Sequence, residues 1–303
     1  MTTSISRSSS PLAAAASRRN FLRGAVGLGA LASLGAVSGC GLTGGASAAE
    51  KTITIIVTES APYQEPIKIA QGLLEEQGWE LKPTYVTDIV QPNIAVANGE
   101  FDANFFQHGA YLQQFSQDNN LDLEASFYVY SSPAGLWSNS YASVDELPDG
   151  ARVALPVDPS NNGRGLKLLA QAGVIEIDES KSVIQLSQQD ITANPKNLEF
   201  VEVDQQSLAT TFEDVDAGFM FVRLAAEIGL TPETALAFEA TEDALPFICL
   251  VAGQPGFAET EKGQALQAAL QSPEVEAWFD DYIGGVLETP WDRDIDADFA
   301  EWS

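Results

Sequence analysis

Short apolar runs alternate with segments of helical periodicity along most of the chain beyond its first 50 residues. Residues 52–57 form a β-branched run typical of a strand. Residues 66–78 then place Ile67, Ala70 and Leu74 on one face of an amphipathic helix that ends at a glycine. No internal repeat interrupts this alternation of strand and helix. The pattern predicts an α/β fold with largely parallel sheets.

The same pattern predicts two lobes. Further strands are expected at residues 81–87, near Phe101, at 126–130, 151–157, 200–203, 215–221 and 247–251. Further helices are expected around residues 94–98, 111–115 and 162–172, from Gln205, and near 261–271 and 273–282. We expect residues 51–132 plus 247–303 to form lobe I and residues 133–246 to form lobe II. Two crossings between lobes leave a cleft, a common location for a ligand site.

The first 39 residues differ in composition from the rest and are typical of an export signal. Arg18 and Arg19 precede Phe-Leu and an uncharged Gly/Ala-rich stretch over residues 24–39, which resembles a twin-arginine signal. That stretch ends in Val-Ser-Gly-Cys, which resembles a bacterial lipobox, and predicts an acylated Cys40 as the mature N-terminus. Residues 40–50 would be the lipidated end and a flexible tether. The alternative is an ordinary secretory signal with an incidental cysteine.

Charge and composition exclude several classes of function. The chain has 15 Lys and Arg against 43 Asp and Glu, for a formal net charge of −28. Four arginines lie in the leader, where no acidic residue occurs, so the rest of the chain is more negative still. Such a field repels phosphate backbones and anionic lipids, so we expect no nucleic acid, and contact with a bilayer only through an anchor. One His and two Cys disfavour a multi-His metal site and a disulfide framework.

Enzyme motifs are absent from the sequence. There is no nucleophile elbow, phosphate-binding Walker loop, dinucleotide fingerprint or His-Glu-x-x-His. A Ser-His-Asp site would have to use His108. The pairs Asp214/Asp216 and Asp294/Asp296 could be proposed for glycoside hydrolysis. With 43 acidic residues such pairs arise by chance, so we expect no catalytic residues and no cofactor.

The segment Asp-Ile-Val-Gln-Pro-Asn at residues 88–93, followed by Asp-Ala-Asn-Phe-Phe-Gln-His at 102–108, is the most distinctive in the chain. Here the sequence resembles the methionine-binding lipoprotein family, the substrate-binding components of methionine-type ABC importers. The similarity continues in order through residues 156–166, 190–198 and 215–217, within about residues 51–285. It implies a two-lobed periplasmic-binding-protein-like fold of type II, with the ligand clamped in the cleft between the lobes.

The resemblance also implies binding residues. Phe106 and His108 match the aromatic residue and the histidine that pack on the ligand side chain, where a ring face and an imidazole edge can grip a thioether. Arg164 matches the family arginine and lies near the start of a helix that Asn161 helps to open. A guanidinium beside free helix N–H groups would form a carboxylate receptor.

Departures from the family pattern concern specificity. Ile89, Val157, Phe221 and Cys249 stand where the family usually carries other side chains, mostly polar ones. Phe221 replaces an asparagine that the family uses to hold the ligand's α-amino group. A buried ammonium without acceptors costs several kcal/mol. We therefore expect a ligand that keeps an acidic group and depends less on an amino group, such as a keto, hydroxy or N-acylated relative of an apolar amino acid.

These observations predict a lipid-anchored substrate-binding protein on the extracytoplasmic face of the cell membrane. It would deliver methionine or a related small carboxylate-bearing ligand to an ABC permease and its ATPase. The alternatives are a binding lipoprotein for a carboxylate that is not an amino acid, an extracytoplasmic enzyme working in the same cleft, and an adhesion or scaffold lipoprotein.

Overall fold

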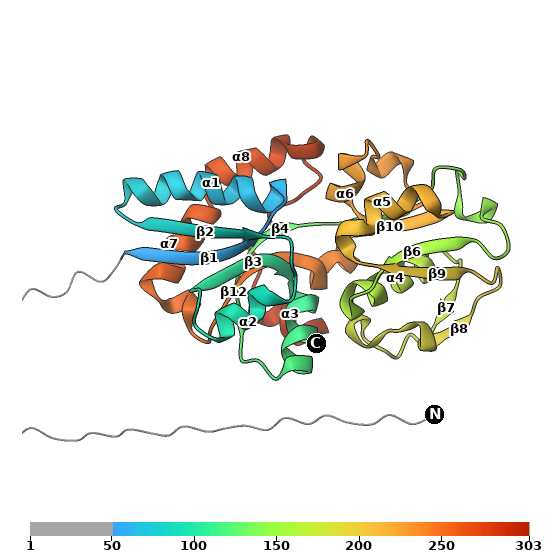
Figure 1. Ribbon diagram of the computed structural model, residues 1–303, viewed down its shortest axis with the longest axis horizontal. Helices are drawn as coiled ribbons and strands as arrows, with labels where there is room; N and C mark the ends of the chain where they lie inside the picture. Colours follow the sequence, from blue (N-terminus) through green and yellow to red (C-terminus); the bar gives the residue numbers. More distant parts are fainter. Residues whose placement is uncertain (1–50, 303) are drawn as a thin grey trace, which may run out of the picture. The chain divides into compact units, whose positions relative to one another are not determined.

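Two five-stranded sheets organise residues 51–302, the part of the chain that this computed structural model describes (Figure 1). The first sheet contains, in spatial order, β2 (Glu80–Val86), β1 (Thr52–Thr58), β3 (Ala103–His108), β12 (Ile248–Gly253) and β4 (Glu124–Ser131). The second contains β11 (Ala237–Phe238), β5 (Ala134–Trp137), β10 (Ala217–Phe221), β6 (Arg152–Pro156) and β9 (Glu199–Val203). A small third sheet pairs β7 (Glu176–Ile177) with β8 (Ile191–Ala193). The predicted α/β class is confirmed.

Both main sheets are mixed, so the prediction of largely parallel sheets was wrong. β1 runs parallel to β2 and β3, and β6 runs parallel to β9 and β10. β12 is antiparallel to β3 and β4, and β5 is antiparallel to β10 and β11. A helical crossover forces parallel strands only when it joins two strands of one sheet. The strands β4, β5 and β12 adjoin the passages between sheets, where this constraint does not apply.

The chain passes between the two main sheets twice. It leaves the first sheet after Ser131 and enters the second at Ala134. It returns between Phe238 and Ile248, partly through a 3₁₀ segment at Thr241–Phe247. The strands of the first sheet therefore fall inside the predicted lobe I, and those of the second inside the predicted lobe II. The lobe boundaries themselves stay a prediction.

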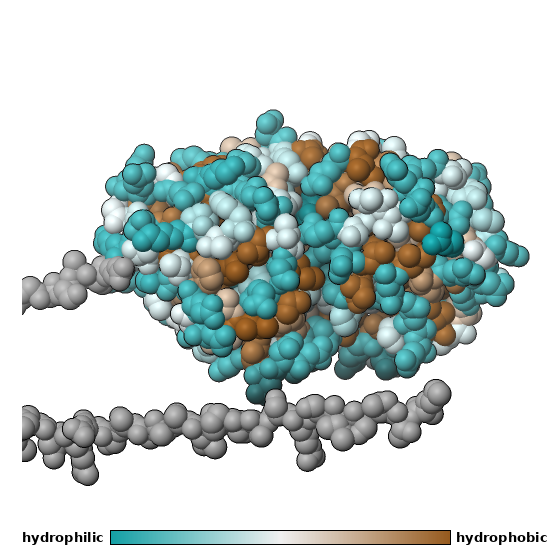
Figure 2. All heavy atoms as spheres, in the orientation of Figure 1, coloured by the Kyte–Doolittle hydropathy of each residue, from teal (hydrophilic) through white to brown (hydrophobic). Residues whose placement is uncertain are grey.

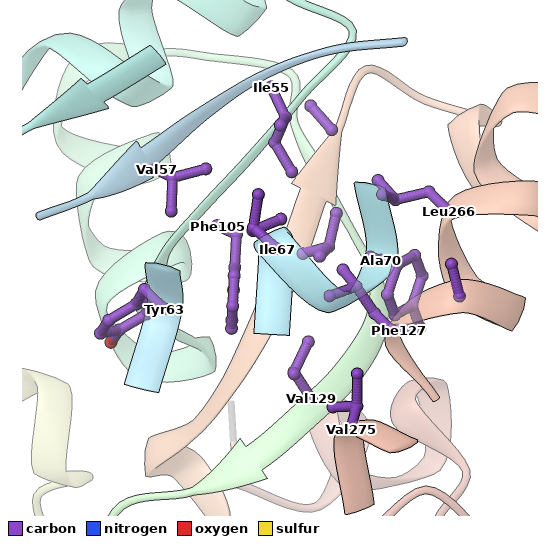
Figure 3. Close-up of a cluster of buried hydrophobic side chains, with 14 of the residues drawn as sticks. Ile55, Val57, Tyr63, Ile67, Ala70, Phe105, Phe127, Val129, Leu266 and Val275 are labelled. Atoms are coloured by element: carbon purple, nitrogen blue, oxygen red, sulfur yellow. The ribbon is translucent and has the colours of Figure 1, made fainter. Parts of the chain in front are cut away.

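Helices cover the first sheet and bury its core. α1 (Ala61–Glu76) packs with α7 (Glu261–Leu270) and α8 (Pro273–Asp281). Figure 3 shows Ile67 and Ala70 of α1 directed at side chains of the sheet, among them Phe105. α1 begins five residues before the predicted start, because Pro62 occupies its first turn and Pro66 lies inside the helix.

The remaining helices are α2 (Gln91–Ala97), α3 (Gly109–Asn119), α4 (Pro159–Gln171), α5 (Leu208–Thr211), α6 (Val222–Glu227) and α9 (Ile295–Trp302). Three of them, α3, α4 and α6, contribute residues to the pocket described below. The sequence pattern did not predict α9. Within residues 51–302, no helix combines the length and the apolar character that crossing a bilayer requires.

The face drawn in Figure 2 carries hydrophilic side chains over much of its area, with apolar patches between them. This agrees with the strong excess of acidic residues in the sequence. The predicted export signal, the lipobox cysteine Cys40 and the tether lie outside the described residues.

Candidate ligand-binding site

A pocket lies between residues of the first sheet and residues of the second, and contains about 370 Å³ of space not filled by protein atoms. This space includes the solvent at the open side of the pocket. The pocket is lined by Tyr63, Ile89, Phe106, Gln107, His108, Tyr111, Ser132, Asn161, Arg164, Gln205, Phe221, Arg223 and Cys249. Two arginines and several aromatic side chains thus share one small space. The lining includes no Asp or Glu among the residues that the structure describes.

Seven of the eight predicted binding residues line this pocket. They are Ile89, Phe106, His108, Asn161, Arg164, Phe221 and Cys249. Val157 does not: the residue is 51% exposed, and its N–H donates to the carbonyl oxygen of Val203 at 2.9 Å as the chain leaves β6. A residue directly after a buried strand can point to either side of the sheet, and here it points to solvent. The roles of the other seven in ligand binding stay predictions.

All but the first residue of the distinctive run at residues 102–108 form β3, and the strand divides its side chains between the core and the pocket. Phe105 packs in the apolar core, whereas Phe106 lines the pocket. Gln107 belongs to a buried cluster of three amides with Asn93 and Asn104. Four hydrogen bonds of 2.7 to 2.9 Å join their side chains. These amides hold one another in place beneath the pocket without any charged group.

His108 is the last residue of β3 and caps α3. Its Nδ1 accepts a hydrogen bond from the N–H of Tyr111 at 3.1 Å, so the ring proton resides on Nε2. Nε2 donates to Oδ1 of Asn161 at 3.0 Å. Burial, and secondarily the charge of Arg164, lowers the pKa of His108 to about 3. The imidazole is therefore neutral and links the first sheet to α4.

The N-terminus of α4 is already capped by the protein. Oδ1 of Asp158 accepts hydrogen bonds from the backbone N–H and from the side-chain amide of Asn161, at 3.0 and 2.9 Å. The Oδ1 of the same Asn161 accepts the hydrogen bond from Nε2 of His108. One chain of hydrogen bonds therefore runs from His108 through Asn161 to Asp158. The free helix N–H groups that the sequence analysis assigned to a ligand carboxylate are partly used within this chain.

Arg164 is almost completely buried, with 1% of its surface exposed, and is paired within the protein. Its Nε and Nη2 donate to the two carboxylate oxygens of Glu239 at 2.6 and 2.5 Å, and Nη2 also donates to the carbonyl oxygen of Ser132 at 2.8 Å. Glu239 further accepts from the N–H of Ala134 at 2.8 Å. The chain leaves the first sheet at Ser132 and enters the second at Ala134, and it begins its return at Glu239. This buried ion pair therefore connects both passages between the sheets to α4.

Sequence reasoning missed Glu239, whose partner is 75 residues away along the chain. The signal that could have found it is a single acidic residue within an apolar run, Leu-Ala-Phe-Glu-Ala at residues 236–240. A buried carboxylate needs a partner. Nη1 of Arg164 is buried and has no hydrogen-bond partner among the described residues.

Sequence reasoning also missed Arg223, on α6 directly after the buried strand β10. Only 4% of its surface is exposed. Its one side-chain hydrogen bond among the described residues is a long one, from Nη1 to Oγ of Ser60 at 3.4 Å. The guanidinium carbon lies 5.4 Å from the ring centre of Phe221 and 6.0 Å from that of Tyr63. Within residues 51–302, no described carboxylate forms an ion pair with Arg223.

Cys249 is a buried free thiol 3.3 Å from the hydroxyl oxygen of Tyr63. Burial raises the pKa of Cys249 and raises that of Tyr63 as well. Both groups are therefore uncharged at neutral pH, and Cys249 contributes apolar surface and not a thiolate nucleophile. No group of His, Cys, Asp and Glu side chains in the described part of the chain is arranged to hold a metal ion.

A pocket between two α/β halves, with the chain crossing twice between them, defines a two-lobed periplasmic-binding-protein fold of type II. The chain belongs to the NlpA lipoprotein family, whose family model matches residues 53–289. It is 34% identical over 258 residues to the methionine-binding lipoprotein MetQ of Bacillus subtilis (strain 168). That match covers 84% of this chain and 93% of the relative.

Solved structures agree with this family and fold. A nutrient binding protein from Burkholderia cenocepacia bound to methionine matches with a TM-score of 0.73 and 30% identity, over 78% of this chain and 99% of the other. An ABC transporter periplasmic substrate-binding protein from Coxiella burnetii matches with a TM-score of 0.72 and 28% identity, over 78% and 99%. The predictions of family and of fold class are confirmed.

Proposed function

We propose that this protein is the substrate-binding component of a methionine-type ABC importer and captures methionine or a related small carboxylate-bearing compound. The observation that carries the proposal is the pocket itself: two buried guanidinium groups and a neutral His108 face the same space as Phe106, Ile89 and other apolar side chains. A small molecule with one acidic end and one apolar end matches that division.

The apolar end of the ligand would pack on Phe106 and on the edge of the His108 ring. His108 suits this role because it carries no charge, so a thioether or alkyl group beside it does not desolvate an ion. The ring of Phe247 lies 5.1 Å from that of His108 at an interplanar angle of 84° and fixes the imidazole from another side.

The partners in this proposal are an ABC permease and its ATPase, in keeping with the transporter relative from Coxiella burnetii. Cys40 would carry the lipid that holds the protein at the extracytoplasmic face of the cell membrane. Mass spectrometry of the membrane fraction should then find an N-terminal acylated cysteine. A protein that begins at another residue would refute the anchor and leave the binding function open.

The binding function is tested by titrating purified protein, freed of bound ligand, with L-methionine and its α-keto acid in a calorimeter. At least one of them should bind and raise the melting temperature, since a ligand that binds only the folded state stabilises it. Phe106→Ala should weaken that binding about tenfold or more through lost apolar contact. A matched control is Phe299→Ala, which removes a half-buried ring on α9 outside the pocket lining. Failure of both compounds to bind wild-type protein would refute the proposal.

A further inference from the structure

We infer that the ligand is a net anion, an apolar carboxylic acid without a charged amino group, and that Arg223 binds its carboxylate. This inference rests on the proposed function and names the class of substrate. It assigns to Arg223 a role that the sequence pattern did not indicate.

The first step of the argument is the charge of the pocket. Two guanidinium groups line it, but only one is balanced by the protein: Arg164 forms its ion pair with Glu239. Arg223 is buried to nearly the same extent and has no carboxylate partner among the described side chains. A buried charge without a partner is strongly unfavourable. An anionic ligand would remove that cost on binding, whereas a zwitterion would bring a second positive charge with it.

The second step concerns the hydrogen bonds that Arg223 lacks. A guanidinium has five N–H donors in a planar fork suited to two carboxylate oxygens. The hydrogen bond to Ser60 is long and uses only one donor. Most of the N–H groups of Arg223 are therefore available to a ligand in the pocket. The rings of Phe221 and Tyr63 lie beside the guanidinium and supply no second charge. A carboxylate at this position would face a receptor that is already shielded from water.

The third step is that the pocket offers little to an ammonium group. Its lining holds no carboxylate among the described residues, and Phe221 can neither donate nor accept. The Oδ1 of Asn161 already accepts from His108, and the amide of Gln107 is engaged with its neighbouring amides. The other polar side chains of the lining are neutral: the hydroxyl of Ser132, the amide of Gln205, and the hydroxyls of Tyr63 and Tyr111, which already contact Cys249 and the carbonyl oxygen of Ile89. Neutral acceptors alone compensate poorly for desolvating an ammonium.

The experiment is a calorimetric titration of the purified, ligand-free protein with four probes. They are L-methionine, its α-keto acid, N-acetyl-L-methionine, and the corresponding thioether amine that lacks the carboxylate. The proteins are wild type, Arg223→Gln, Arg223→Lys and the control Arg152→Gln, which changes an arginine outside the pocket whose Nη1 donates to the carbonyl oxygen of Asp214. Circular dichroism and melting curves establish that each variant is folded.

We expect the keto acid to bind wild-type protein at least about tenfold more tightly than L-methionine, and the amine not to bind. Arg223→Gln should weaken binding of the keto acid by about ten- to a hundredfold. The ratio of the affinities for the keto acid and for L-methionine should then be smaller than in wild-type protein. Arg223→Lys should retain part of the affinity because it keeps the charge, and Arg152→Gln should leave it unchanged.

Two results would overturn the inference while leaving the proposed function intact. One is L-methionine binding as tightly as the keto acid. The other is Arg223→Gln leaving the affinity for the keto acid unchanged, which would show that Arg223 does not bind the carboxylate. Binding of no probe at all would refute the proposed function and this inference with it.

Discussion

Glu239→Ala should strongly destabilise the protein, because Glu239 is the partner of a fully buried arginine. The substitution removes both oxygens that receive the Arg164 guanidinium and leaves that charge buried among Phe221 and Phe247, whose ring centres lie 5.6 and 4.0 Å from the guanidinium carbon. It also removes the acceptor of the Ala134 N–H. Both effects act on the segments that connect the two sheets.

The magnitude follows from these two losses. Removing one partner of a buried ion pair costs about 3–5 kcal/mol, and a buried N–H without an acceptor costs about 1–3 kcal/mol. The losses overlap, since both fall on one side chain, so we expect a decrease of about 4–6 kcal/mol in the free energy of unfolding. For a protein of this size that lowers the melting temperature by roughly 10–20 °C. A typical protein has a free energy of unfolding of about 5–15 kcal/mol, so the expected loss is a large part of the total.

The assay is urea unfolding followed by circular dichroism on ligand-free protein, with the exposed Glu76→Ala as control. The control should change stability by less than about 0.5 kcal/mol. The free energy of unfolding of a double variant, Arg164→Met with Glu239→Leu, should be much closer to that of wild type than the value for Glu239→Ala. The reason is that two apolar side chains leave no buried charge. The reasoning is refuted if Glu239→Ala costs less than about 1 kcal/mol, or if the double variant is less stable than the single one.

Two further predictions concern pH and packing. Because the pKa of His108 is about 3 in the folded protein and 6.5 in a free chain, the unfolded state binds a proton between these values that the folded state does not. Stability should therefore fall as pH drops below 6.5, by up to about 1.4 kcal/mol per pH unit. His108→Gln should remove this contribution in urea titrations, and an unchanged pH dependence would contradict it. In the glycine pair of α4, a Cβ at Gly163 would lie 2.2 Å from the backbone oxygen of Val183, whereas one at Gly165 would lie 2.7 Å from the side-chain Cδ2 of Leu155. Gly163→Ala should thus cost roughly 3 kcal/mol and Gly165→Ala about 1 kcal/mol in the same assay, and equal losses would count against the packing argument.

Local patterns in the sequence predict the α/β class and most of the long strands, although β3 begins two residues after Phe101, near which it was expected. These features depend on neighbouring positions, as in the run at residues 102–108, where alternation alone separates Phe105 from Phe106. The same holds for the buried positions of α1. Its true start was missed because Pro66 resembles a helix beginning, although Pro62 occupies that place.

Features that depend on distant residues could not be predicted in this way. The partner of Arg164 is Glu239, and the hydrogen bond of Arg223 reaches Ser60, 163 residues away. No periodicity in the sequence connects such distant positions. Which charged side chains of the pocket are paired can therefore be seen only in the folded structure. The orientation of Val157 was missed for a related reason: the end of a strand no longer dictates which way the side chain points.

The position of β12 has a consequence for how the chain is assembled during synthesis. This strand lies between β3 and β4, pairing Val251 with Phe105 on one side and with Phe127 on the other. Every strand of the second sheet is made before it. The second sheet can therefore close while the first still lacks its inner strand, and long-range pairings of this kind form slowly. The half of the domain that leaves the ribosome first is thus completed last, and a nascent chain that stops before β12 leaves β4 without its neighbour in the sheet.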